Sequence, residues 1–212
     1  MEIVSKQSDF IEKIAPVIVA EAKARGYKFP SAIIAQACLE SAWGKSKLAS
    51  KYFNYFGLKC GSAWKGASVN LSTMEEYTAG TLTKITDNFR VYSSMSAGVA
   101  GYFDFISTKR YSNLKNATTS LDYLQKIKSD GYATSSYYVN NVFTLVTQYN
   151  LGKYDIVSEA VDVTATKDFE TIVTEVIQGK WGNGNARKSA LIKAGYDYAS
   201  IQAEVNKRIK GK

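Results

Sequence analysis

The chain has 212 residues, a net charge of +8, and ordinary proportions of hydrophobic (45%) and charged (22%) side chains. It can therefore form one sizeable domain plus a small one, and it is not a disordered protein. It contains no histidine, which excludes Ser-His-Asp and Cys-His nucleophilic sites and His-Glu-x-x-His zinc hydrolases. If the protein is an enzyme, carboxylates are the expected acid and base groups, and glycoside hydrolysis is the reaction that carboxylates alone serve best.

The basic charge and the 15 tyrosines indicate which partners to expect. A basic surface attracts a polyanion, whether nucleic acid, anionic lipid or an anionic cell wall, but no dense Lys/Arg stripe favours nucleic acid. Tyrosine suits carbohydrate binding because it joins a flat apolar face to a hydrogen-bonding tip, although a Tyr-rich core explains the count equally well. Cys38 is expected to be a small buried side chain, and whether it pairs with Cys60 stays open.

The first predicted helix begins near Ser8 or Asp9, either of which can cap it. Pro16 is expected to kink this helix or split it in two, and Gly26 fits the end of the second part. The apolar run at 14–20 is short and contains Pro16, so the sequence predicts neither the core of a signal peptide nor a membrane span.

A second helix is predicted to open at Pro30, with Ser31 as its cap, and to carry Glu40 near its C-terminal end, about one turn before Gly44. Glu40 shares the apolar stripe of this helix. The helix dipole and apolar neighbours both disfavour a negative charge there, so both raise the pKa of a carboxyl group, as a general acid requires. A glutamate at the rim of the stripe, with its carboxylate in water, fits the periodicity at least as well.

Between residues 64 and 92 the pattern changes to two strands joined by a turn at 78–80. Glu75 and Glu76 lie on the first arm of this predicted hairpin. Because successive strand side chains point to opposite faces, at most one of them can face a cleft over Glu40, and the pattern does not say which. A solvated acidic pair is the simpler interpretation.

Three more helices are expected, at 94–106, 120–128 and 139–149. Between the last two lies the polar, Tyr-rich loop GYATSSYY at 131–138. Loops of this composition often line binding sites, because a rigid scaffold holds them where water and ligands reach them. The alternative is that a tyrosine packs this loop against the core.

The C-terminal part is predicted to be a linker followed by three short helices. The first of these runs from Asp168 to Gln178, the second has a cap at Asn185 and ends at Gly195, and the third places Ile201, Val205 and Ile209 four residues apart. The core of such a small unit is marginal, which is more typical of a recognition module than of an enzyme.

Residues of about 5–154 resemble the peptidoglycan glucosaminidases of glycoside hydrolase family 73. The segments that carry the resemblance, in order, are IAQACLESAWGKSKLA (34–49), NYFGLK (54–59), EEYTAG (75–80), FRVY (89–92) and GYATSSYYVNNV (131–142). The resemblance implies a lysozyme-like helical catalytic domain with a small β-hairpin lobe. With a three-helix bundle after it, the whole chain is expected to be mainly α (α+β).

By this resemblance the Ala-x-x-x-Glu-Ser-x-Trp-Gly motif makes Glu40 the general acid, and Trp43 of the same motif is a candidate substrate contact. The family's second carboxylate lies on a mobile hairpin, typically just before a tyrosine. Here that residue is Glu76, which precedes Tyr77, and Glu75 is the fallback because the acid is doubled.

The family's Tyr-Ala-Thr-Asp-Pro-x-Tyr motif corresponds to residues 132–138, with Ser135 and Ser136 in place of Asp-Pro. The resemblance makes Tyr138 the residue that touches the sugar at the cleavage point, with Tyr132 as a supporting substrate contact. In the NYFG motif, the side chains are expected to have structural roles.

Residues 168–210 are similar to the three-helix cell-wall-binding repeats of phage lysozymes, through GKWGNGNARKSALIKAGYDYASIQAEVN (179–206). This similarity implies binding to muropeptide units, with Trp181, Asn183 and Arg187 as candidate contacts. An equally good interpretation of Trp181 is that it anchors the small core.

The sequence thus predicts a glucosaminidase catalytic domain (1–154), an acidic linker (155–166) and a cell-wall-binding three-helix module (167–212). The expected activity is that of a bacteriolytic endolysin, which cuts the β-1,4 bond between N-acetylglucosamine and N-acetylmuramic acid without a cofactor or metal. The expected partners are glycan strands and muropeptides of bacterial peptidoglycan, with no nucleic acid and no stable membrane insertion. With no signal peptide, release through a phage-made membrane hole is expected, or secretion with the signal trimmed. The alternatives are a non-catalytic wall-binding protein on a lysozyme-like scaffold and a muramidase.

Overall fold

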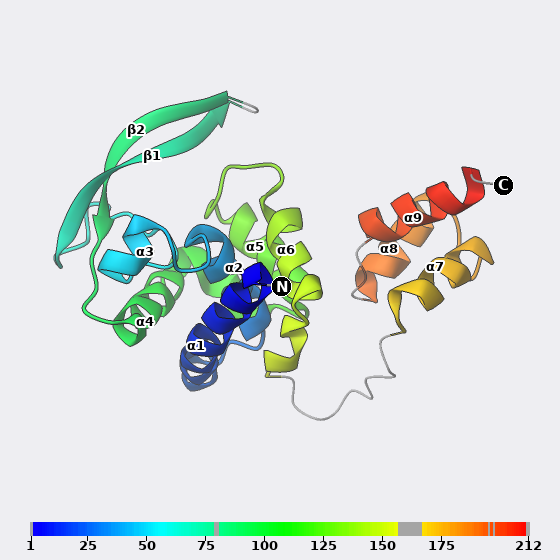
Figure 1. The fold of residues 1–212 in the computed structure, drawn as a ribbon, viewed down its shortest axis with the longest axis horizontal. Helices are drawn as coiled ribbons and strands as arrows, with labels where there is room; N and C mark the ends of the chain where they lie inside the picture. The colour runs from blue at the N-terminus through cyan, green and yellow to red at the C-terminus, as the bar shows by residue number, and fades with distance from the viewer. Residues whose placement is uncertain (1, 79–80, 157–166, 195, 197, 211–212) are drawn as a thin grey trace. The chain divides into compact units, whose positions relative to one another are not determined.

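The computed structural model describes residues 2–78, 81–156, 167–194, 196 and 198–210 (Figure 1). Within these ranges it leaves out the side chains of 2–5, 74–78, 81–82, 193, 199 and 210. The chain forms two compact units, Met1–Val157 and Ser158–Lys212. Among the described residues, no helix has the length and apolar character needed to cross a bilayer.

The first unit is a helical body with one antiparallel hairpin. Its elements are α1 (Glu2–Arg25), α2 (Pro30–Glu40), α3 (Lys47–Tyr52), β1 (Ser68–Thr78), β2 (Thr81–Arg90), α4 (Met95–Ile106), the 3₁₀ segment η1 (Lys109–Asn116), α5 (Ser120–Ser129), α6 (Tyr138–Gln148) and the 3₁₀ segment η2 (Leu151–Tyr154). The predicted fold class, mainly helical with a small β-hairpin lobe, is confirmed. The sequence pattern does not predict α3, η1 or η2.

Helix α1 runs from Glu2 to Arg25 and contains Pro16, so the predictions of a cap at Ser8 or Asp9 and of a split at Pro16 are wrong. Pro16 is exposed. Ile14 and Ile18 on either side of it are fully buried, so packing holds both halves of the helix in place despite the lost backbone hydrogen bond.

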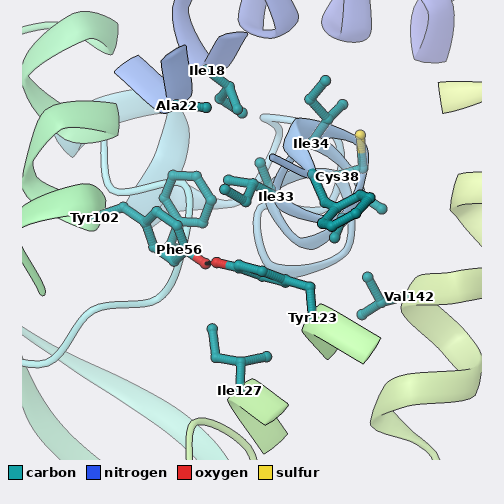
Figure 2. Close-up of a cluster of buried hydrophobic side chains, with 14 of the residues drawn as sticks. Ile18, Ala22, Ile33, Ile34, Cys38, Phe56, Tyr102, Tyr123, Ile127 and Val142 are labelled. Atoms are coloured by element: carbon teal, nitrogen blue, oxygen red, sulfur yellow. Dashed lines mark hydrogen bonds between the residues drawn. The ribbon is translucent and has the colours of Figure 1, made fainter. Parts of the chain in front are cut away.

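Helix α2 is the centre of the first unit, because every residue from Pro30 to Cys38 is buried. Figure 2 shows its side chains surrounded by other elements, with Ile33, Ile34 and Cys38 of α2 beside Ile18, Ala22, Phe56, Tyr102, Tyr123, Ile127 and Val142. Ile33 and Ile34 are 0% exposed, and burial of each contributes about 1.5–3 kcal/mol of transfer free energy. Cys38 is buried and both cysteines are free thiols, so the open question of a disulfide is answered.

A residue far along the chain caps the first turn of α2. The N–H of Ser31 donates to Oδ1 of Asp155 and its hydroxyl donates to Oδ2, each at 2.9 Å. The N–H of Ile156 donates to the carbonyl of Lys28 at 2.8 Å. The predicted cap at Ser31 is wrong, because Phe29 holds the cap position and Ser31 lies inside the helix. The first two residues of the predicted linker are therefore bound to the first unit.

The hairpin extends from the helical body as a two-stranded ribbon (Figure 1). Its base is attached to the loop before it, because Cys60 donates to Asn88 at 2.8 Å and Arg90 donates to Leu58 at 2.9 Å through backbone groups. The predicted strands are confirmed, whereas positions 79–80 of the predicted turn lie outside the described residues.

The second unit contains α7 (Phe169–Ile177), α8 (Gly184–Lys193) and α9 (Tyr198–Lys210). Its buried core consists of Ile172, Val173, Val176, Leu191, Ile201 and Val205. The cap predicted at Asn185 is wrong, because Asn183 holds that position. Ile209 is 58% exposed, so the apolar stripe predicted for α9 ends one turn early. The end predicted at Gly195 lies outside the described residues.

The Asp155 cap predicts a dependence of stability on pH. Burial raises the pKa of Asp155 to about 6 from 3.8. The folded protein therefore holds this proton more tightly than the unfolded chain, so ionisation of Asp155 lowers stability as the pH rises from about 4 to about 6. We expect the free energy of unfolding of the wild type, relative to Asp155→Asn, to be roughly 1–3 kcal/mol higher at pH 4 than at pH 7 in urea titrations.

Asp104→Asn is the matched control. Asp104 is an acid of the same unit whose side chain is 68% exposed, in an ion pair with Arg25. The difference in the free energy of unfolding between Asp104→Asn and the wild type should change by much less between pH 4 and pH 7. A difference in the free energy of unfolding between the wild type and Asp155→Asn that stays constant with pH would contradict this account of the cap.

Candidate active site

A groove of about 1030 Å³ lies in the first unit, where the hairpin meets the helical body. Its walls come from the end of α2, the loop before the hairpin, both strands and the loop before α6. The lining includes Glu40, Gly57, Leu71, Ser72, Thr73, Arg90, Phe105, Arg110, Tyr132 and Tyr138. Ligand sites usually measure about 300–1000 Å³, so this groove has room for a segment of a polymer.

Glu40 reaches the groove because α2 ends at this residue. Three residues with left-handed backbone follow it closely, namely Ala42 (φ 50°), Trp43 (φ 60°) and Gly44 (φ 75°). The first two cost roughly 1–2 kcal/mol each, since a Cβ is crowded in this conformation. At Gly44 an added Cβ would lie 2.6 Å from the ring of Phe10, so only glycine fits. This turn fixes the half-buried Glu40 side chain at the groove.

Tyr138, the first residue of α6, is the polar neighbour of Glu40. The Glu40 carboxyl group lies close to its hydroxyl, and burial together with this acidic neighbour raises the pKa of Tyr138 well above its usual value. Gly57 is also close, since a Cβ built on it would lie 3.7 Å from Oε2 of Glu40, which is an ordinary van der Waals contact. Tyr138 and Gly57 are thus both neighbours of the carboxyl group.

A buried chain of hydrogen bonds continues from Tyr138 into the core. Nε2 of Gln36 donates to the Tyr138 hydroxyl at 2.8 Å, and the Tyr102 hydroxyl donates to Oε1 of Gln36 at 2.8 Å. The hydroxyls of Tyr102 and Tyr123 lie 2.9 Å apart (Figure 2). Sequence reasoning missed Gln36, which looks like any other residue of an apolar helix; its position one turn before Glu40 was the available signal.

Tyr132 lines the groove, but its hydroxyl already has a partner. It donates to the carbonyl of Phe56 at 2.8 Å, while its ring lies 6.0 Å from that of Tyr138. The ring of Phe56 stacks on Tyr102 at 3.9 Å. Tyr132 therefore supports Tyr138 and offers the groove its ring edge and face rather than a free hydroxyl.

Asn54 joins the loop before the hairpin to the end of β2. It is 2% exposed, and its Nδ2 donates to the carbonyls of Leu58 and Arg90 at 2.9 Å each. Its Oδ1 accepts from the N–H of Leu58 at 2.9 Å. The role of Asn54 is therefore structural, and it sets the hairpin base against the groove floor.

Two arginines that the sequence analysis did not select flank an aromatic pair in the groove. The guanidinium of Arg90 lies 5.4 Å from the centre of the Phe105 ring, and that of Arg110 lies 5.5 Å from the centre of Tyr111. Phe105 and Tyr111 pack at 5.1 Å. Tyr111 is only 1% exposed, so this part of the groove offers a ligand the half-buried ring of Phe105 and two positive charges.

The structure does not bring every predicted site residue into this groove. Trp43 lines a separate pocket of about 340 Å³ beside Phe10 and packs on Tyr149 at 4.9 Å. Glu75 and Glu76 lie on β1, where their backbones pair with Thr83 and Leu82, and the structure does not describe their side chains.

The three residues selected in the second unit surround the loop before α8. Nε1 of Trp181 donates to Glu175 at 3.0 Å. Arg187 donates to Oδ1 of Asn183 at 2.8 Å and to the carbonyl of Gly182 at 2.9 Å. Their polar groups therefore hold the loop in shape.

The chain matches known proteins over both units. A family model named Glucosaminidase, described as mannosyl-glycoprotein endo-beta-N-acetylglucosaminidase, matches residues 15–151, and a CW_7 repeat model matches residues 170–209. The exo-glucosaminidase LytG of Bacillus subtilis (strain 168) is 30% identical over 190 residues, which are 85% of this chain and 63% of LytG.

Two further relatives are informative. A probable N-acetylmuramidase of Lactococcus lactis subsp. cremoris (strain MG1363) is 34% identical over 160 residues, which are 71% of this chain and 36% of that protein. The crystal structure of a mutant peptidoglycan hydrolase from Sphingomonas sp. A1 matches with a TM-score of 0.61 at 27% identity, over 70% of this chain and 97% of that one. The chain spans less than two thirds of the length of LytG and of the muramidase.

The contacts of Asn54 predict a large loss of stability on truncation. Asn54→Ala removes three hydrogen bonds to backbone groups in a buried place, so we expect the free energy of unfolding to fall by about 2–4 kcal/mol. The exposed Asn70, which donates to Asn88 at 2.9 Å, is the matched control, and Asn70→Ala should cost no more than about 0.5 kcal/mol. Equal losses in urea titrations of both variants would show that Asn54 does not join the hairpin base to the body as described.

Proposed function

The chain belongs to the Glucosaminidase family of hydrolases, and from this membership we propose that it hydrolyses peptidoglycan with Glu40 as the general acid. The proposed target is the β-1,4 bond between N-acetylglucosamine and N-acetylmuramic acid. The observation that carries the proposal is the half-buried Glu40 carboxyl group, which lies in a large groove at the end of a buried helix and in contact with Tyr138. The helix C-terminus and the loss of water both favour the protonated acid.

In the proposed reaction Glu40 protonates the glycosidic oxygen as the bond to the anomeric carbon breaks. A hairpin carboxylate, Glu76 or else Glu75, activates a water molecule that attacks the opposite face of the sugar, which inverts the configuration. Such a pair of carboxyl groups stands roughly 6.5–9.5 Å apart. The position of Leu71, Ser72 and Thr73 on the groove wall supports this assignment, because β1 continues from them to the two glutamates.

Tyr138 is proposed to hold Glu40 and to touch the sugar at the cleavage point, with Tyr132 supporting it from behind. Arg90 and Arg110 are proposed to attract the carboxylates of the substrate. Trp43 packs outside the groove and takes no part in the proposed reaction.

The second unit is proposed to bind muropeptides, which the match to the CW_7 repeat supports. Trp181, Asn183 and Arg187 would act by holding the loop before α8 in its binding shape. Tethering such a module to the catalytic unit raises the effective concentration of enzyme at an insoluble wall. This arrangement and the basic charge fit a bacteriolytic endolysin.

Muramidase activity is the second candidate, because one relative is named a probable N-acetylmuramidase. Mass spectrometry of the new reducing ends after digestion of purified cell walls separates the two activities. We expect N-acetylglucosamine at the new reducing end, whereas N-acetylmuramic acid there would establish the muramidase. A wall-binding protein without catalysis would release no new ends.

The acid role of Glu40 predicts a severe loss of activity in Glu40→Gln. General acids contribute about 10²–10⁴-fold in rate, so lysis of purified walls should fall by that factor. Sedimentation with walls should stay unchanged, because the second unit keeps its surface. Turnover above a tenth of the wild type would refute the acid role.

The hairpin carboxylates predict a difference between two adjacent variants. If Glu76 activates water, Glu76→Gln should lose about 10²-fold or more in rate while Glu75→Gln stays near the wild type. NMR of the earliest product should show an inverted anomeric configuration. Retention of configuration, with both variants active, would instead indicate that the N-acetyl group of the substrate is the nucleophile.

A further inference from the structure

The hydrogen bonds that begin at Tyr138 have a definite direction. A phenol has one proton to donate, and the side-chain amide nitrogen of Gln36 can only donate. Tyr102 uses its proton on Oε1 of Gln36, so Tyr123 must donate to Tyr102. Because Nε2 of Gln36 donates to the Tyr138 oxygen, the proton of Tyr138 is left for Glu40.

We propose that Gln36 is a positioning residue, which holds Tyr138 with its proton directed at Glu40. The chain of hydrogen bonds that begins at Tyr123 then stabilises the carboxylate that remains after Glu40 has protonated the leaving group. This inference rests on the proposed function. In the step concerned, the O–H bond of Glu40 breaks and one forms on the glycosidic oxygen, and the electron pair stays on Glu40. Every donor in the chain then points toward the new negative charge.

The geometry of α2 makes this a rigid device. Gln36 and Glu40 lie four residues apart on α2, so their side chains share one face of the helix, and Tyr138 of α6 contacts both. Tyr102 comes from α4 and Tyr123 from α5, so four helices contribute to the chain.

Burial makes each link of the chain strong. Gln36 and Tyr102 are 0% exposed, Tyr123 is 1% exposed and Tyr138 is 5% exposed. Water is therefore excluded from most of the chain, and hydrogen bonds in such surroundings are stronger and polarise one another. Gln36 also lies in an otherwise apolar stretch of α2, where an amide without partners would be destabilising.

Other charged groups near Glu40 act on it as well, but they are unchanged by a substitution at Gln36. The titratable groups in the groove lining, apart from Glu40, are Lys47, Lys59, Cys60, Arg90, Arg110, Tyr111, Tyr132 and Tyr138. Glu75 and Glu76 are on the strand that continues from the groove wall. A shift in the pH dependence of the activity on changing Gln36 therefore reports on the chain of hydrogen bonds.

The test is Gln36→Leu in the full chain, with the pH dependence of kcat and KM measured on soluble peptidoglycan fragments. Without the amide, Tyr138 is a poorer donor and the ionised form of Glu40 is less stable. We expect kcat to fall about 10-fold with KM changed less than about twofold, and the alkaline limb of the kcat profile to move up by about half a pH unit or more. Tyr102→Phe should move the limb in the same direction by less, and it replaces Gln36→Leu if that variant does not fold.

Tyr27→Phe is the matched control, because Tyr27 is another buried tyrosine, 2% exposed, whose hydroxyl donates to Ile106 at 3.2 Å outside the chain. It should lose stability without any movement of the limb. If the alkaline limb of the kcat profile lies at the same pH in Gln36→Leu and Tyr102→Phe as in Tyr27→Phe, the positioning role is overturned.

A second readout does not depend on activity. With ¹³C-labelled glutamate, the carboxyl signal of Glu40, assigned by its loss in Glu40→Gln, should titrate at higher pH in Gln36→Leu than in the wild type. A shifted titration in a protein that does not hydrolyse peptidoglycan would overturn the proposed function and keep the positioning role. An unshifted titration in a protein that does hydrolyse peptidoglycan would overturn the positioning role and keep the proposed function.

Discussion

The burial of α2 is the constraint on which the other features of the first unit depend. Nine consecutive residues of this helix are buried, and the next two, Leu39 and Glu40, lie at the groove. The Glu40 carboxyl group at that end is half-buried and lies beside the hydroxyl of Tyr138. The same packing that stabilises the first unit therefore also sets the surroundings of the Glu40 side chain.

Two polar side chains, each distant in sequence from its partners, hold this helix and the groove in register. Asp155 binds the start of α2, and Asn54 binds the loop that runs to the hairpin base. Both make hydrogen bonds to backbone groups. Apolar packing places the helices, and these two polar contacts then fix the start of α2 and the base of the hairpin.

The sequence predicted those elements whose signals are local. Helical spacing placed α4, α5 and α7 to within a residue or two. In the structure Ser94, Thr119 and Asp168 bind the first turns of their own helices, so the ends of these helices depend on local contacts. It failed at Ser31, since the true partner lies 124 residues away, and at Pro16, where buried neighbours outweigh the helix-breaking tendency. In the groove, motif resemblance selected Glu40 and Tyr138, which do lie together. It did not select Gln36, because the role of an amide in an apolar helix becomes clear only once its partners from two other helices, Tyr138 and Tyr102, are known.

The attachment of Asp155 and Ile156 to the start of α2 limits how this architecture can be recombined. A fusion that joins a different second unit at residue 154 would remove the carboxylate that caps the central helix, and the first unit would be weakened at a place remote from the join. Gene rearrangements that exchange modules among such proteins should therefore be tolerated only downstream of Ile156. Natural chimaeras ought to keep an acidic residue at this point, whatever follows it.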